Sequence, residues 1–267
     1  MDERVSISID QGIAHVVLNR PDKMNALDHG MFQGIVNAGE QLRGDASVRA
    51  VVISGAGRAF CAGLDMQNFS RMERQTTSQS LFADDLTTRT HGIANTAQHV
   101  AMVWREVPVP VIAAVHGVAF GGGLQIALGA DMRFVTPDLR MSVMEIMWGL
   151  VPDMAGIVLM RELARPDIVR DLTFSGRIFS GQEALEYGFA TRVCDDPLET
   201  AMQAAREIAS KSPSAIRAAK RLLRASVDQD AASLLMAESV EQRALMGSDH
   251  QKEAVRANME KRAPVFV

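Results

Sequence analysis

The stretch of the chain that decides the fold reads Val115-His116-Gly117-Val118-Ala119-Phe120-Gly121-Gly122-Gly123-Leu124-Gln125. Its apolar first half is typical of a buried strand, and its second half opens an apolar helix through three consecutive glycines. Since glycine has no side chain, the first amides of that helix stay uncovered and suit an anion or a polarised carbonyl oxygen. A triple glycine also occurs as a tight turn or a close helix contact, and this stretch alone leaves both interpretations open.

The wider segment from Val107 to Ala130 contains no Asp, Glu, Lys or Arg and is long enough to suggest a membrane span. Pro108, Pro110 and the glycine run interrupt it and argue against a transmembrane helix. We therefore expect a buried strand, a glycine turn and a buried helix, with no membrane contact.

Outward from this segment, strands alternate with helices. Val5–Ile9 and Ile13–Leu18 are predicted as two strands joined by a turn at Gln11-Gly12. Apolar residues at helical spacing between 27 and 42 predict a helix capped by Asp28. Further short apolar strands are expected at 49–55, 111–115 and 132–135. This alternation predicts a mostly parallel α/β core with crossover connections.

The last third of the chain is predicted to be nearly all helix from Gly181 onward. Its helix starts carry a capping residue followed by proline, or a capping box, at 180–183, 196–199, 212–213 and 248–251. We expect residues 1–195 to form the core. Residues 196–267 are expected to form a helical C-terminal oligomerisation region that packs on the core or on a neighbouring subunit.

Composition and charge exclude several classes of protein. The chain has 267 residues, of which 47% are hydrophobic and 22% charged, and these values exclude a disordered chain. The net charge of -4 argues against a broad cationic surface for nucleic acid. Cys61 and Cys194 do not make a disulfide framework or a metal cluster, and no secretory signal is recognisable. We therefore expect a cytoplasmic protein without a bound metal.

Five pieces of the chain, in their order and spacing, resemble the crotonase superfamily, the enoyl-CoA hydratase/isomerase family. The pieces are 18–27 (LNRPDKMNAL), 60–65 (FCAGLD), 115–123 (VHGVAFGGG), 144–146 (MEI) and 180–184 (SGQEA) with Gly188 following. The resemblance covers essentially the whole chain. It implies an α/β fold, a crotonase-like spiral of ββα repeats with a helical C-terminal region that supports homotrimers or dimers of trimers.

The same resemblance implies an acyl-CoA thioester as the substrate. The backbone amides of Leu64 and Gly122 are expected to bind the thioester carbonyl as an oxyanion hole, where each donor is worth roughly 3–4 kcal/mol. No separate cofactor is expected, because coenzyme A is part of the substrate. The residues expected to contact the coenzyme are Lys23, Ala26, Ala62, Gly63 and Asp65. A solvated lysine is the alternative for Lys23.

The acids and bases decide the reaction. Hydratases of this superfamily carry a glutamate after the glycine run and a second one about a strand later, and here these positions hold Gln125 and Glu145. An amide orients a water or the substrate but does not exchange a proton at neutral pH. Asp153 follows Glu145 by eight residues, a spacing similar to that of the dienoyl-CoA isomerases.

Two carboxylates along an extended substrate remove a proton at one carbon and deliver one at another, as double-bond migration requires. Apolar neighbours are expected to raise the pKa of Glu145 and of Asp153. The structural alternatives are that Glu145 pairs with a backbone group and that Asp153 starts a helix after Pro152. An aspartate at position 153 also resembles the nucleophile of aryl-CoA dehalogenases, which need a different set of partners.

We therefore expect an enoyl-CoA hydratase/isomerase family enzyme that hydrates an unsaturated acyl-CoA thioester or moves its double bond. Glu145 is predicted as the principal acid and base, Asp153 as its partner and Gln125 as an orienting group. The alternatives are a dienoyl-CoA isomerase specifically, or a non-catalytic acyl-CoA-binding or assembly protein on the same fold.

Other segments have less specific predictions. Residues 66–95 are expected to form a surface connection or a wall over the acyl pocket. His116 and Cys61 are predicted as core residues rather than catalytic ones. Four basic residues at helical spacing predict a solvated face, with coenzyme phosphates or RNA as alternatives: Arg217, Lys220, Arg221 and Arg224.

Overall fold

The computed structural model describes residues 4–66 and 85–266, and within them the main feature is a six-stranded sheet. β1 (Val5–Asp10) and β2 (Ile13–Leu18) form an antiparallel hairpin. Four more strands follow, each parallel to its neighbour, in the order β3 (Ala50–Gly55), β4 (Val111–Val115), β6 (Met132–Val135) and β9 (Arg192–Val193). The mostly parallel α/β core predicted from the alternation is confirmed.

A second sheet has three strands and adjoins the first where the chain leaves β4. β5 (Val118–Phe120) pairs in parallel with β7 (Arg140–Ser142), which pairs antiparallel with β8 (Phe179–Ser180). Only two residues separate β4 from β5. The N-terminus of the next helix, α4 (Gly122–Gly129), therefore lies where the two sheets meet.

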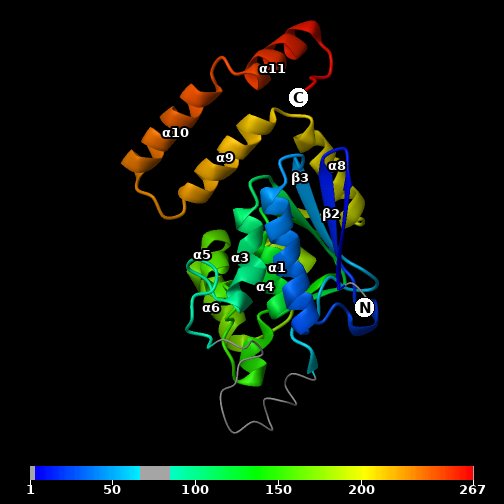
Figure 1. The fold of residues 1–267 in the computed structure, drawn as a ribbon. Coiled ribbons are helices and arrows are strands. Elements are labelled where there is room, and N and C mark those ends of the chain that lie inside the picture. Colours follow the sequence, from blue (N-terminus) through cyan, green and yellow to red (C-terminus); the bar gives the residue numbers. More distant parts are fainter. Residues whose placement is uncertain (1–3, 67–84, 267) are drawn as a thin grey trace.

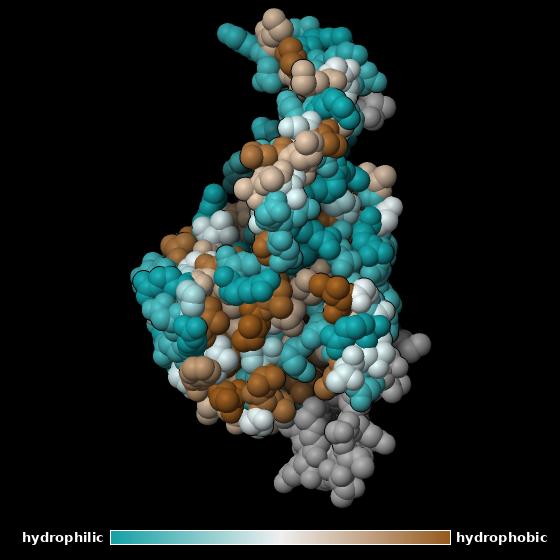
Figure 2. All heavy atoms as spheres, turned by 90° about the vertical axis from the view of Figure 1, so that its left-hand side faces the viewer, coloured by the Kyte–Doolittle hydropathy of each residue, from teal (hydrophilic) through white to brown (hydrophobic). Residues whose placement is uncertain are grey.

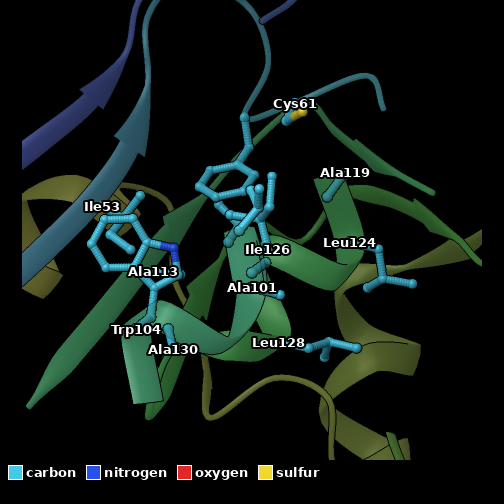
Figure 3. Close-up of a cluster of buried hydrophobic side chains, with 14 of the residues drawn as sticks. Ile53, Cys61, Ala101, Trp104, Ala113, Ala119, Leu124, Ile126, Leu128 and Ala130 are labelled. Carbon is cyan, nitrogen blue, oxygen red and sulfur yellow. The ribbon is translucent and has the colours of Figure 1, made fainter. Parts of the chain in front are cut away.

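Helices cover both faces of the large sheet (Figure 1). On one face, α1 (His29–Gly44), α3 (Thr96–Glu106) and α4 bury their apolar sides in the main core. Figure 3 shows Trp104 of α3 beside Ile53 and Ala113 of the strands. Every residue of α4 is buried, which agrees with its charge-free sequence.

Helix α8 (Pro197–Ala209) covers the opposite face of the same sheet. Its alanines at positions 201, 205 and 209 pack against the strand residues that point away from the main core, such as Val52 and Ile112. The predicted boundary between residues 195 and 196 thus falls just before a helix that belongs to the packing of the sheet.

Further helices surround the second sheet and form the C-terminal part of the chain. α5 (Gly156–Leu163) packs on α4, α6 (Pro166–Ser175) on the 3-10 helix η2 (Met144–Trp148), and α7 (Gly181–Tyr187) on β8 and β9. The helices that extend away from the core are α9 (Pro213–Ala225), α10 (Ala231–Leu245) and α11 (Asp249–Glu260) (Figure 1).

One lysine anchors α9 to the core. Lys220 Nζ donates to Trp104 O at 3.2 Å, to Val109 O at 2.8 Å and to Asp131 Oδ2 at 2.8 Å. The side chain is only 8% exposed. The solvated face predicted for the basic residues of this helix is therefore wrong for Lys220.

The local signals in the sequence correspond to observed turns and caps. Gln11 (φ 48°) and Gly12 (φ 79°) form the predicted hairpin turn, and Asp28 Oδ1 caps α1 by accepting from the amide of residue 31 at 2.8 Å. The capping box at Ser180 is complete. The box predicted at Ser248 is only half formed, because the side chain of Gln251 accepts from the amide of residue 247 instead.

The structure describes all of the segment 107–130 but only part of the segment 66–95. In the stretch from Val107 to Ala130 the predicted strand and helix are confirmed as β4 and α4, and a second short strand that was not predicted, β5, lies between them. Within residues 4–66 and 85–266, no helix combines the length and the apolar composition that crossing a bilayer needs. Of the segment 66–95 predicted as a connection or a wall over the acyl pocket, residues 67–84 lie outside the described part of the chain.

Candidate active site

Two glycine-rich segments that are far apart in sequence run side by side at the junction of the sheets. Cys61 N donates to Val118 O at 3.1 Å, and Phe120 N donates back to Cys61 O at 3.1 Å. A Cβ on Gly123 would lie 2.3 Å from Cys61 O. Because that contact is too short for any side chain, glycine is required for the two segments to approach this closely.

The amide of Leu64 is left without an acceptor by this arrangement. Gly63 O accepts from Leu27 N at 2.8 Å, and the N–H of the same trans peptide, which belongs to Leu64, points the opposite way. Gly63 has a φ of +85°, and a Cβ on it would lie 2.6 Å from Phe120 O and 3.7 Å from Gly122 N. The peptide that carries the Leu64 amide therefore lies close to Gly122.

The second amide opens α4. Gly121 N donates to Ser142 O at 3.0 Å, and the next amide, that of Gly122, is the first of the helix. Among residues 4–66 and 85–266, neither Leu64 N nor Gly122 N donates a hydrogen bond to the protein. Two neighbouring unbonded amides, one of them at a helix N-terminus, form a suitable site for a carbonyl oxygen that gains negative charge.

Glu145, in the first turn of η2, lies beside this pair of amides. A Cβ on Gly121 would be 3.0 Å from Glu145 Oε1, so the carboxylate lies against the glycine that precedes the Gly122 amide. Gln125 Nε2 donates to Oε1 at 2.6 Å, whereas Oε2 is buried and has no partner among the described residues. Burial raises the pKa of Glu145, and the charge of Asp153 adds to that rise.

Gln125 is bonded at both ends of its amide and is 1% exposed. Its Oε1 accepts from Met154 N at 2.9 Å and from Gly156 N at 2.8 Å, while its Nε2 donates to Glu145. The protein therefore holds both ends of the predicted orienting group in place.

Asp153 lies in the turn that precedes α5. It is exposed at the surface, yet the protein around its carboxyl group excludes enough water to raise its pKa. The residue that caps α5 is Ala155, so Asp153 does not have the helix-starting role considered as its alternative. Asp153 is also close enough to Glu145 for the two charges to repel each other.

The apolar surface beside Glu145 suits an acyl chain. Ile146, Met147 and Trp148 are 42%, 67% and 45% exposed, although they are large hydrophobic residues. Figure 2 shows hydrophobic side chains gathered on the side of the core where α5 and α6 lie.

The residues predicted to contact coenzyme A lie together but differ in their exposure and in their contacts with the protein. Lys23 is exposed on the 3-10 helix η1 (Pro21–Lys23). Ala62 and Gly63 belong to the glycine-rich segment, and Ala62 N donates to Met24 O at 2.9 Å. The remaining two contact Arg20, whose Nη1 donates to Asp65 Oδ2 at 2.5 Å and to Ala26 O at 3.1 Å.

Sequence reasoning did not single out Asn25, which holds this region together. It is fully buried, and its Nδ2 donates to Ala59 O at 2.8 Å and to Phe60 O at 3.1 Å. Its φ of 55° is left-handed, a conformation that asparagine tolerates better than most residues. The sequence signal that could have identified Asn25 is an asparagine beside small residues in a segment without regular periodicity.

His116 and Cys61 both bond to the backbone. His116 Nε2 lies 2.9 Å from Gly57 O. The Cys61 thiol donates to Asn25 O, and burial raises its pKa to about 12. A thiol with that pKa is not a nucleophile at neutral pH, so the prediction of a buried filler is confirmed.

One further cluster of ionisable residues lies between α1 and α3. Glu40, His99 and Glu106 place potential metal-binding atoms within 4.8 Å of one another. Arg43 pairs with both carboxylates, at 3.1 Å and 2.8 Å. The cluster is therefore an ion-pair network in which arginine supplies the positive charge.

Comparison with known proteins gives consistent matches. Residues 8–267 match the family model described as Enoyl-CoA hydratase/isomerase. The chain is 32% identical over 217 residues to the mitochondrial Delta(3,5)-Delta(2,4)-dienoyl-CoA isomerase of Mus musculus, a match that covers 80% of this chain and 66% of that protein. It is 29% identical over 265 residues to a probable enoyl-CoA hydratase of Bacillus subtilis, covering 98% of each.

A solved structure is similar over its whole length. The putative enoyl-CoA hydratase/isomerase from Mycobacterium abscessus superposes with a TM-score of 0.89 at 30% identity, covering 98% of this chain and 99% of that one. The likeness therefore includes the C-terminal helices as well as the sheets.

Proposed function

This chain belongs to the enoyl-CoA hydratase/isomerase family, and we propose that its reaction within that family is the migration of a double bond in an unsaturated acyl-CoA thioester. Membership makes the chain an enzyme of a family whose reactions are hydration and double-bond migration. The predicted α/β spiral of ββα repeats is confirmed by the match to a solved structure of this family.

The observation that carries the proposal is the set of groups around Glu145. Moving the conjugated double bonds of a dienoyl thioester needs proton removal at one carbon and proton delivery at another, and two groups that exchange protons along the acyl chain can do both. Glu145 and Asp153 both have raised pKa values and influence each other electrostatically. The third polar side chain, Gln125, is an amide and carries no exchangeable proton at neutral pH.

The amides of Leu64 and Gly122 would bind the thioester oxygen. When a proton leaves the carbon next to the thioester, negative charge moves onto that oxygen. Two preorganised donors in a site shielded from water would stabilise the charge by roughly 3–4 kcal/mol each. Their lack of protein acceptors and their closeness to Glu145 support this role.

The coenzyme would lie along the residues near η1 and the glycine-rich segment. Lys23 is exposed there and available for a phosphate, while Ala62 and Gly63 offer backbone surface. Arg20 already donates hydrogen bonds to Asp65 and to Ala26 O. The coenzyme would therefore contact these two residues either alongside Arg20 or by displacing it. No cofactor beyond the coenzyme in the substrate is proposed.

We also propose a homotrimer or a dimer of trimers in the cytoplasm. The exposed apolar side chains of α10, such as Leu235 (62%) and Met236 (66%), support an assembly, because α10 buries no residue within the single chain. The cytoplasmic location remains a prediction.

An absorbance assay tests the proposed reaction. A 3,5-dienoyl-CoA and a 2-enoyl-CoA are each mixed with the purified enzyme and followed in the ultraviolet. We expect the dienoyl band to move to that of the 2,4-dienoyl product faster than the enoyl-thioester band is lost, and Glu145→Gln to abolish the change while coenzyme A still binds. Faster loss of the enoyl band would instead identify a hydratase. Full activity of Glu145→Gln would exclude Glu145 from the mechanism.

A further inference from the structure

We infer that Gln125 is a positioning residue that confines proton exchange at Glu145 to one atom, Oε2, and couples the placement of Glu145 to that of Asp153. This inference rests on the proposed role of Glu145 as acid and base.

The orientation of the Gln125 amide is dictated by its neighbours. The N–H groups of Met154 and Gly156 can only donate, so the atom facing them at 2.9 Å and 2.8 Å must be Oε1. The other end, Nε2, then faces Glu145 Oε1 at 2.6 Å and must donate to it. Two backbone amides thus fix the direction of a side chain that is 1% exposed.

This direction determines which oxygen of Glu145 carries a proton. An oxygen that accepts an N–H from Gln125 at 2.6 Å does not also hold a proton on the same side, so the protonated form carries its proton on Oε2. Oε2 is buried and has no partner among the described residues. It is therefore the atom of Glu145 left to exchange a proton with a bound substrate.

The same amide links the two carboxylates. Asp153 directly precedes Met154, whose N–H is held by Gln125, so a shift of Gln125 would move both Glu145 and the turn that carries Asp153. A Cβ on Gly156 would lie 2.6 Å from Gln125 Oε1, so glycine is needed there for the amide to take this position.

Few charged groups compete with this control. α4 contains no ionisable residue. α5, which packs on α4, carries Arg161 and Glu162, and α6, which packs on η2, carries Asp167, Arg170 and Asp171. Among the charged groups in the described ranges, Asp153 is the one whose charge shifts the pKa of Glu145.

The test compares Gln125→Glu with the matched substitution Gln98→Glu in the capping box of α3. The new carboxyl group at position 125 can still accept from the two backbone amides, but it can donate to Glu145 only when it is itself protonated, and two adjoining carboxyl groups resist being ionised together. The apparent pKa of Glu145, followed by carbon-13 NMR of side-chain-labelled glutamate, should rise by at least about one unit. Gln98→Glu should leave it unchanged.

Kinetics provide the second measurement on the same pair of variants. For Gln125→Glu at pH 7 we expect kcat on the dienoyl substrate to fall about 10- to 100-fold while KM changes less than about threefold, because the proton-transfer step is affected more than binding. An unchanged Glu145 pKa with unchanged kcat would overturn the inference. Since the titration needs no substrate, an enzyme inactive on every thioester would refute the proposed reaction, while the NMR result would still decide the role of Gln125.

A second variant covers the case in which Gln125→Glu does not fold. Gly156→Ala keeps the glutamine but forces its amide away from the added Cβ. As for Gln125→Glu, we expect the Glu145 pKa to rise and kcat to fall in this variant. Wild-type values of both in Gly156→Ala would contradict the positioning role.

Discussion

At the scale of single residues, Glu145 is the side chain whose environment most needs a functional explanation. One of its oxygens is buried without a partner among the described residues, and burial raises its pKa. An unsatisfied buried polar atom lowers the stability of the folded chain. The same environment would suit the proposed acid and base, because it moves the pKa of Glu145 toward neutrality, as proton transfer requires.

The cost of burying Glu145 should be visible in the pH dependence of stability. Its pKa is raised in the folded chain. Between the unfolded and folded pKa values the folded state binds more protons, so stability falls as the pH rises through that window. The neutral variant Glu145→Gln removes this loss, so its Tm relative to wild type should be higher at pH 8 than at pH 4, by about 2–4 °C for each kcal/mol. Differential scanning calorimetry measures both values.

The exposed Glu207 provides the control for that experiment. Glu207→Gln should change the Tm by the same small amount at both pH values. If Glu145→Gln showed no more pH dependence than Glu207→Gln, burial of the Glu145 charge would not destabilise the fold.

Asp153 should matter more when a double bond migrates than when water adds. We expect Asp153→Asn to lower kcat on a 3,5-dienoyl-CoA by about 10²–10⁴-fold, the usual contribution of a general acid or base, and to affect a 2-enoyl-CoA less. Asp195→Asn, at an exposed position, should affect neither substrate. Equal losses on both substrates in steady-state assays would count against the isomerase assignment.

Part of the candidate site was predictable from the sequence and part was not. Leu64, Gly122 and Glu145 lie in short segments whose composition and order carry the family resemblance, and the structure brings them together. The bonds of Gln125 to Met154 and Gly156 were not predictable, because side-chain hydrogen bonds across about thirty residues leave no local pattern.

At the scale of elements, the site depends on two crossing segments that only glycines allow. The two segments approach so closely that a Cβ on Gly63 would lie 2.6 Å from Phe120 O and a Cβ on Gly123 would lie 2.3 Å from Cys61 O. Because these contacts hold the Leu64 peptide beside the start of α4, the proposed oxyanion hole would depend on backbone packing rather than on side-chain chemistry.

Replacing Gly63 with alanine should move the Leu64 amide. The added Cβ meets a backbone oxygen, Phe120 O, which cannot rotate away as a side chain does. We expect kcat to fall about 10²–10³-fold, as on loss of one oxyanion donor. Gly247 has a similar φ of +76°, and a Cβ added there would meet no atom within 4 Å. The variant Gly247→Ala therefore measures the effect of backbone strain without a steric clash. Equal kcat values for the two variants would contradict the role assigned to this crossing.

At the scale of the whole molecule, the C-terminal helices divide into two kinds. α8 packs on the sheet, whereas α9 to α11 extend from the core (Figure 1). Large apolar residues of the last two helices are exposed, such as Met236 of α10 (66%) and Met259 of α11 (80%). Exposed apolar surface of this extent is typical of a site that another subunit covers.

Light scattering coupled to size-exclusion chromatography should therefore find three or six times the chain mass of 29.0 kDa. The double variant Leu235→Glu with Met236→Glu should lower that mass, because charged side chains are costly in an apolar interface. Gln203→Glu, on α8, is the control and should not lower it. A wild-type mass of one chain would exclude the proposed assembly.

Much of the fold was predictable because its signals act over a few residues. The hairpin turn at Gln11-Gly12 and the caps at Asp28 and Ser180 are examples. The different destinations of α8 and α9 were not predicted, since Asp196-Pro197 and Ser212-Pro213 start both helices in the same way. The alanines repeated every four residues in α8 indicate its close packing on the sheet only once the sheet is known.

A crystal structure of Glu145→Gln with a bound 3,5-dienoyl-CoA tests the central claim most directly. We predict the thioester oxygen within about 2.7–3.1 Å of both Leu64 N and Gly122 N, with the side chain at position 145 facing the acyl chain next to it. A thioester oxygen bound by other groups, with these two amides directed at water or protein, would contradict the account.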